Sequence, residues 1–377
     1  MNGLERVVAV MEGRQPDRVP LGFYLADCDI IGHVIGRKTY ARDKIGQQVA
    51  LWEGRRDEIV ASLMGDVIDF YRKIDLCDVL THKEAILPSA NYQPQKVERL
   101  ADDVWRDEQG RVYKVSELSN EFVCVEDPTG DAEREFRPED FPEDDVPGEV
   151  DETEFAAFDR LIAELGGERF ILGPGHLGAM VLLGGMERGL MEYVTNPEAV
   201  RAAARRNVRH ANARDARAIR PGQHGVLFEQ DYGTTRAPMM SPAMFREFCF
   251  PAIRERTQHV KRHTKYAFLH SCGNTWPLIE MFIEAGLDGY QSLQTGAGMD
   301  IDKLREKFGT KLVWWGGIPV ETLVKGTADE VRRDVRRACK IAKRGGVILG
   351  PSHSIAYGMP YENFLAMLDE FDRCAWY

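Results

Sequence analysis

The chain has 377 residues, of which 44% are hydrophobic and 29% charged. This length suits one large barrel-type domain with insertions, and the apolar content excludes a disordered chain. The formal net charge of −11 argues against a nucleic-acid-binding protein, because contacts to phosphates need a surface of clustered lysines and arginines.

The negative charge is concentrated in one segment. Residues 126–154 contain fourteen acidic residues and two arginines, so the rest of the chain is close to neutral. Such a run is typical of a solvated acidic excursion, and the alternative is a docking face for a basic partner.

The sequence indicates a cytoplasmic protein without a membrane partner. No apolar run approaches the ~18 residues that mark a transmembrane helix. Residues 1–17 carry charges among their apolar residues and lack the core of a signal peptide. Seven cysteines, an odd number scattered between Cys28 and Cys374, do not form a disulfide framework, so we expect reduced thiols.

Short apolar runs predict strands buried in a parallel sheet. Helices with clear starts lie between them: Asn196 and Ser241 each precede a proline, and Thr327 begins a capping box. Along the chain, the predicted strands are residues 19–24, 66–71, 170–172, 225–228, 266–269, 288–290, 311–315 and 346–349.

Eight strand–helix units with short loops predict the α/β class and a closed (β/α)8 barrel, or TIM barrel. Residues 82–152 interrupt the alternation, and Gln109-Gly110 marks a hairpin within them. We therefore expect residues 1–377 to form one barrel domain with an inserted acidic hairpin and loop region.

Polar residues gather where the predicted strands end. In a (β/α)8 barrel these ends carry the active site, so the pattern favours an enzyme over a scaffold. The residues are His176, Glu229, Asp231, His270, Cys272, Gln294, Ser352 and His353.

The segment His270-Ser-Cys272-Gly273 is a candidate metal site. An imidazole and a thiolate two residues apart at a strand end can reach one ion, and nitrogen with sulfur suits zinc. His353 could be the third ligand, which would leave the fourth position open as in catalytic zinc sites. The alternative is two buried polar residues and a small core thiol.

Two other features have weaker interpretations. Gly173-Pro-Gly175-His-Leu-Gly178 matches a dinucleotide-binding fingerprint, but it lies in mid-chain, and Glu198, about twenty residues on, lies in the first turn of a helix and not at a strand end, which favours a tight backbone turn. Glu229 and Asp231 could do acid–base work or bind a substrate amine. Alternatively, one of them caps a helix or pairs with an arginine.

Several segments together resemble the uroporphyrinogen decarboxylase superfamily, in the right order and over nearly the whole chain. The resemblance implies a (β/α)8 barrel, which the alternation of strands and helices predicts independently. The segments are Arg14-Gln-Pro-Asp-Arg-Val-Pro20, Asn196-Pro-Glu198, Ser241-Pro-x-x-Phe-Arg-Glu247, His270-Ser-Cys-Gly273, Gly350-Pro-Ser-His-Ser-Ile355 and Pro360-x-Glu-Asn363.

The superfamily implies at least two activities. True uroporphyrinogen decarboxylases need no cofactor and carry an arginine segment after the first strand that clamps substrate carboxylates. Here the corresponding stretch is Leu21-Gly-Phe-Tyr-Leu-Ala-Asp-Cys-Asp29, which contains no arginine. Without a bidentate cationic clamp an octacarboxylate porphyrinogen has little to hold it there, so the resemblance is closer to the other branch.

That branch comprises methyltransferases that move methyl groups to or from a cobalamin held by a separate corrinoid protein. Several bind zinc through His-x-Cys and a later cysteine. His270 and Cys272 match the first two ligands, and His353 stands where the later cysteine falls. Zinc can act as a Lewis acid on the departing atom. The cobalamin must come from the partner, because this chain lacks the Asp-x-His-x-x-Gly sequence that binds it.

The expected activity is methyl transfer between a small methylated ether, amine or thiol and that cobalamin. The alternatives are a uroporphyrinogen decarboxylase-type lyase and a non-catalytic barrel that binds corrinoid or tetrapyrrole. The expected partners are the substrate and the corrinoid protein, with a homodimer left open.

Each candidate residue receives a role in this interpretation. Asp231, His270 and His353 are the expected catalytic residues, and Tyr232 and Trp315 could offer aromatic faces to a methylammonium group or pack at the barrel mouth. The expected substrate-binding residues are His176, Glu229, Tyr232, Gln294, Trp315 and Ser352.

Overall fold

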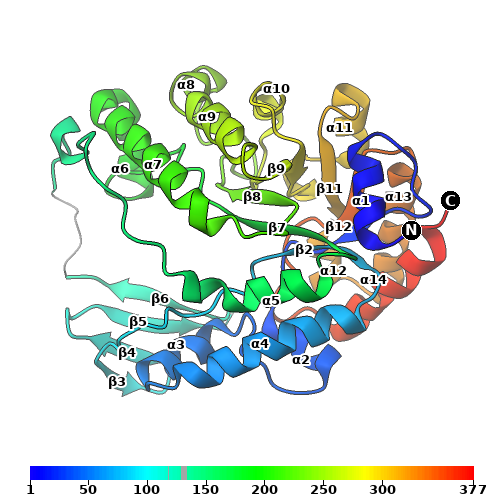
Figure 1. The fold of residues 1–377 in the computed structure, drawn as a ribbon, viewed down its shortest axis with the longest axis horizontal. Coiled ribbons are helices and arrows are strands. Elements are labelled where there is room, and N and C mark those ends of the chain that lie inside the picture. The colour runs from blue at the N-terminus through cyan, green and yellow to red at the C-terminus, as the bar shows by residue number, and fades with distance from the viewer. Residues whose placement is uncertain (118, 129–133) are drawn as a thin grey trace.

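The computed structural model describes residues 1–117, 119–128 and 134–377. Eight parallel strands close into a barrel in the order β1-β12-β11-β10-β9-β8-β7-β2, with helices around it (Figure 1). This confirms the predicted (β/α)8 fold. The barrel strands are β1 (Leu21–Gly22), β2 (Cys77–Thr81), β7 (Phe170–Gly175), β8 (Gly225–Glu229), β9 (Tyr266–His270), β10 (Gly289–Gln291), β11 (Val313–Ile318) and β12 (Val347–Pro351).

The helices follow the strands in the expected alternation. Ser241 and Thr327 accept hydrogen bonds from backbone N–H groups in the first turns of their helices, as their capping positions predict. The α-helices are α1 (Gly3–Met11), α2 (Cys28–Ile35), α3 (Lys44–Trp52), α4 (Arg56–Lys73), α5 (Ala156–Leu165), α6 (Met186–Thr195), α7 (Pro197–Ala218), α8 (Pro242–Phe248), α9 (Phe250–Val260), α10 (Ile279–Glu284), α11 (Ile301–Phe308), α12 (Val320–Lys325), α13 (Ala328–Ala342) and α14 (Tyr361–Cys374). Short 3-10 turns cover Pro138–Asp140, Glu152–Phe155, Trp276–Leu278 and Thr295–Ala297. No helix in these described ranges combines the length and apolar content needed to cross a bilayer.

The predicted strand at residues 66–71 is wrong, because this segment belongs to α4. Its apolar residues continue a helical spacing that begins further upstream, with Ile59, Leu63, Val67 and Phe70 buried on one face. The second barrel strand is instead β2, where the charged Asp78 interrupts the apolar run and hides the pattern.

The predicted interruption of the barrel lies between β2 and α5 and includes a four-stranded antiparallel sheet. The hairpin around Gln109-Gly110 is confirmed, since β4 and β5 pair on either side of it. Trp52 on α3 contacts the rings of Trp105 and Phe122, which ties the sheet to the barrel helices (Figure 1). Part of the acidic run, residues 129–133, lies outside the described residues. The strands are β3 (Val97–Ala101), β4 (Val104–Asp107), β5 (Val112–Ser116) and β6 (Glu121–Glu126).

Apolar side chains pack on both sides of the barrel wall, inside the lumen and between the strands and the outer helices. Side chains such as Phe170, Phe268 and Trp315 fill the lumen together with Val7 and Val10 of α1. The backbone N–H of Leu4 donates to the carbonyl of Glu168, just before β7, so α1 closes the amino-terminal end of the barrel. The barrel is therefore a packed core, and the opposite end is left for chemistry.

A buried ion-pair cluster joins α1, β1 and β2 beneath the lumen. Arg18 contacts Asp78 through both guanidinium nitrogens at 2.7 and 3.1 Å, and Arg6 adds a third contact at 3.2 Å. The backbone N–H of Leu21 donates to the same carboxylate at 2.8 Å. Arg18 and Asp78 are both buried, so their charges depend on each other.

We expect Asp78→Ala to lower the free energy of unfolding by about 3–5 kcal/mol, because it leaves Arg18 buried without a counter-charge. Urea denaturation measures the loss. The control is Asp57→Ala, whose carboxylate is fully exposed and whose loss should cost less than ~0.5 kcal/mol. Equal losses in the two variants would contradict a structural role for the cluster.

Candidate active site

His270, Cys272 and His353 converge at the carboxyl end of the barrel. His270 is the last residue of β9, Cys272 follows two residues later, and His353 lies two residues after β12. Their ligand atoms all lie within 4.8 Å of one another, and Cys272 Sγ is 3.3 Å from His270 Nε2. Parallel strands bring their ends to one face, so residues 83 positions apart meet here.

The surroundings of His270 direct one ring nitrogen toward the cluster. Its Nδ1 contacts the side-chain oxygen of Gln291, the last residue of β10. Because that oxygen only accepts, Nδ1 carries the proton and the lone pair of Nε2 faces Cys272. The ring stacks on Tyr24 with centroids 4.0 Å apart and planes 8° apart. Burial lowers the pKa of His270 to about 4, so the ring is neutral at pH 7.

His353 and Cys272, the other two members of the cluster, also have neighbours that affect their protonation. His353 Nδ1 lies 2.8 Å from Ser354 Oγ, and burial lowers the pKa of His353. Burial and the Asp231 carboxylate raise the pKa of Cys272 to about 12, which keeps it a thiol until a cation replaces the proton. Asp231 is half-exposed, and its Oδ1 accepts from the backbone N–H of Cys272 at 2.7 Å.

This donor set fits zinc. Two neutral imidazoles and one thiol supply the nitrogen and sulfur ligands that zinc prefers, and three protein ligands leave a coordination position open for substrate. Hydrogen bonds from the outer ring nitrogens, of the kind that Gln291 and Ser354 provide, orient ligating histidines.

Glu229 ends β8 beside the cluster and is already paired. Lys83 Nζ lies 2.5 Å from one carboxylate oxygen, and the Tyr24 hydroxyl donates to the other at 2.5 Å. Burial raises the pKa of Glu229, but the Lys83 charge, His82 and the hydrogen bonds from Lys83 and Tyr24 together outweigh it, so the pKa is lowered. Glu229 is therefore ionised at pH 7 and holds Tyr24, which in turn supports the His270 ring.

Gln294 and Ser352 brace the backbone around the cluster. The side-chain oxygen of Gln294 accepts from the backbone N–H of Gly273 at 3.1 Å. Ser352 is fully buried, and its hydroxyl accepts from the N–H of Val320 at the start of α12. Both side chains therefore position backbone around the cluster, and Gln294 remains partly exposed.

Tyr232 and Trp315 do not meet the expectation of aromatic faces at the mouth. Tyr232 is buried between barrel and helices, where its ring packs on Phe245 and Phe282. Trp315 is buried in the lumen, and its indole N–H donates to the carbonyl of Gly22 at 3.1 Å. Both rings stabilise the fold, because each strand residue points either into the lumen or out to the helices.

His176 follows β7 but stays outside the metal cluster and lines a separate pocket with His82 and Glu229. The glycines before it serve packing rather than a nucleotide: a Cβ on Gly175 would lie 2.1 Å from a methyl group of Val226. Gly178 has a φ of +64°, which provides the tight turn that the sequence favours.

Sequence analysis missed Tyr24, Lys83 and Gln291. Tyr24 and Gln291 lie in or next to their strands, whereas the sequence pattern points only to polar residues that follow strands. Lys83 does follow a strand, two residues after β2, but that strand was misplaced.

Comparison with known proteins gives the family. Residues 155–374, more than half of the chain, match the family model of uroporphyrinogen decarboxylase (URO-D). The chain belongs to the uroporphyrinogen decarboxylase family. No curated protein matches it.

One solved structure supports the fold of this URO-D family member. A methyltransferase from Methanosarcina mazei is similar with a TM-score of 0.61 and 16% identity, over 99% of each chain. A protein from Listeria monocytogenes, described as a vitamin-B12-independent methionine synthase, has a TM-score of 0.48 and 12% identity over 95% of this chain and 96% of its own. At these identities the likeness concerns the barrel, and residue roles must come from the site itself.

We expect the purified protein to bind about one zinc per chain and Cys272→Ala to retain less than about a tenth of that, because the anionic sulfur offsets the charge of the ion as well as completing its shell. Elemental analysis of protein from zinc-supplemented medium measures the content. Cys124→Ala, an exposed cysteine in the inserted sheet, is the matched control and should bind zinc like the wild type. Equal zinc content in Cys272→Ala and the control would rule out the thiol as a ligand.

We expect Gln291→Leu to weaken zinc binding about 10–100-fold, since it removes the acceptor that fixes the His270 tautomer. Competition with a chromogenic chelator measures the affinity. Gln223→Leu replaces a buried glutamine at the opposite end of the barrel wall and should leave zinc affinity unchanged. If both variants bind zinc like the wild type, Gln291 does not orient the ligand.

Proposed function

We propose that this URO-D family member is a methyltransferase that moves a methyl group between a small methylated substrate and the cobalamin of a separate corrinoid protein. The observation that carries the proposal is the convergence of His270, Cys272 and His353 at the barrel mouth. A nitrogen and sulfur ligand set with an open position suits Lewis-acid activation of an ether, amine or thiol.

The charges at the mouth count against a porphyrinogen substrate. Residues 21–29, which lead from β1 into the mouth, contain Asp27 and Asp29 and no arginine. Asp231 adds a half-exposed carboxylate next to Cys272. An octacarboxylate would meet the half-exposed Asp231 and no cationic clamp within residues 21–29, whose Asp27 is itself buried and paired with Arg42, so decarboxylation of uroporphyrinogen is disfavoured.

The residues of the chain have distinct tasks in the proposed reaction. Bound zinc would supply a Lewis acid for the atom that carries or receives the methyl group. Asp231 accepts a hydrogen bond from the backbone of Cys272 and provides a carboxylate base close to its thiol. Tyr24 and Gln291 hold the His270 ring in place, and Lys83 keeps Glu229 ionised so that Tyr24 stays anchored.

The test is a spectrophotometric assay of cob(I)alamin conversion to methylcobalamin over a panel of methyl ethers, methylamines and thioethers. We expect at least one substrate to be turned over. Cys272→Ala should lose about 100-fold or more of the rate, because removing the Lewis acid withdraws several kcal/mol of stabilisation from the transition state. The rate of Cys124→Ala should match the wild type.

A porphyrinogen product assay on the same samples separates the alternatives. Decarboxylated product at an enzyme-like rate of about 1 s⁻¹ would show that the methyltransferase proposal is wrong. Tight corrinoid binding without turnover of any substrate, even with free cob(I)alamin in excess, would favour the non-catalytic barrel.

A further inference from the structure

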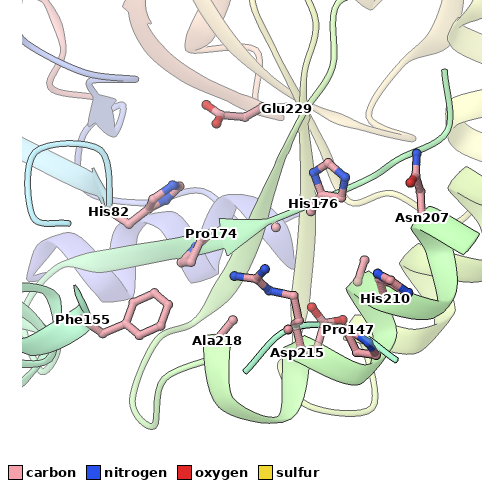
Figure 2. Close-up of a pocket in the computed structure, with 14 residues that line it drawn as sticks. His82, Pro147, Phe155, Pro174, His176, Asn207, His210, Asp215, Ala218 and Glu229 are labelled. Carbon is pink, nitrogen blue, oxygen red and sulfur yellow. The ribbon is translucent and has the colours of Figure 1, made fainter. Parts of the chain in front are cut away.

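A second cavity lies beside the barrel mouth, and the proposed metal chemistry does not use it. It has a volume of about 480 Å³, within the usual range of small-molecule sites. Figure 2 shows its side chains around a common space, with Glu229 at one end and Ala218 and Asp215 at the other. We call it the side pocket, defined by Phe155, Pro174, His176, Ala211, Arg214 and Ala218.

Residues 134–155, which include most of the acidic segment, form one wall of the side pocket and are held against α7 by polar contacts. Asp145 forms an ion pair with Arg206 and lies 3.3 Å from His210 Nε2. Arg209 donates to the carbonyl of Pro142 at 2.7 Å. These contacts place Pro147 and Gly148 in the lining of the side pocket, which remains partly open to solvent.

The carboxylates that line the side pocket are already neutralised. Glu229 is paired with Lys83. Asp215 is buried and contacts the guanidinium of Arg256 at 2.6 and 3.0 Å. Neither is free to attract a cationic ligand, so the acidic residues of the pocket contribute no net negative charge.

Arg214 brings a positive charge to the side pocket, within electrostatic range of the Glu154 carboxylate. It is exposed on α7 and forms no ion pair with any described residue. Its guanidinium also adds to the effect of burial in lowering the pKa of His176. An arginine that forms no ion pair among the described residues, at a cavity lined by both polar and apolar groups, can form a charge-assisted, bidentate contact to a carboxylate.

His82 adds a polar group to the side pocket. His82 is buried, its pKa is lowered to about 4 by burial, and its Nδ1 has no hydrogen-bond partner among the described residues. A buried polar atom without a partner is costly unless a ligand or water satisfies it. Apolar contacts come from Phe155, Pro174, Ala211 and Ala218.

We propose that the side pocket binds a small organic acid whose carboxylate pairs with Arg214 and whose apolar body packs against Phe155 and Pro174. A polar substituent at the far end of the ligand would meet His82. This site is distinct from the cluster of His270, Cys272 and His353, so it does not depend on the proposed methyl transfer.

The experiment is calorimetric titration of the full chain with benzoate and with benzamide, its neutral isostere. We expect benzoate to bind saturably with a dissociation constant below ~10 mM. Benzamide should bind at least tenfold more weakly, because only the acid makes a charge-assisted contact. Arg214→Gln should weaken benzoate binding at least tenfold. Arg217→Gln removes the same charge one turn along α7, outside the pocket, and should bind within twofold of the wild type.

A second variant tests the position of the ligand without changing charge. Ala218→Leu fills part of the cavity from the partly exposed end of α7 and should also abolish binding. The proposal is overturned if the wild type shows no saturable benzoate binding, if benzamide binds equally well, or if Arg214→Gln binds like Arg217→Gln. Normal benzoate binding by Ala218→Leu would place the acid elsewhere and overturn it as well.

Discussion

The site at the top of the barrel depends on a charge cluster at the bottom. The first barrel strand consists of only two residues, so its own ladder holds it weakly. Asp78 stabilises the position of this short strand. Its carboxylate accepts a hydrogen bond from the N–H of Leu21 and also forms ion pairs with Arg18 and Arg6. The register of β1 fixes the position of Tyr24, three residues beyond Leu21. Tyr24 in turn supports the ring of His270.

Much of the fold and the metal cluster follows from the sequence, because two strong regularities apply. Apolar runs that alternate with capped helices identify parallel strands, and parallel strands end on the same face. These rules bring His270, Cys272 and His353 together from distant parts of the chain. These rules did not predict the second strand, because the charged Asp78, which forms a buried ion pair, interrupts its apolar run.

The parts that could not be predicted depend on which way side chains point. A position near a strand end does not reveal whether Tyr232 faces the mouth or the helix layer, and in the structure it faces the helices. Likewise, nothing in the spacing connects Tyr24 with Glu229, or Gln291 with His270, because those contacts arise from closure of the barrel. Supporting residues are therefore harder to predict than ligands, whose chemical type is distinctive.

The acidic segment has a further physical consequence. Its described part is held to the barrel by contacts such as Arg206 of α7 with Asp145 and Arg220, just after α7, with Glu152, both at or near the surface. The Debye length is about 10 Å at 0.1 M salt and about 3 Å at 1 M, so these attractions weaken as ions accumulate around them. The electrostatic attraction between this segment and the barrel is therefore stronger at low ionic strength and weaker at high ionic strength.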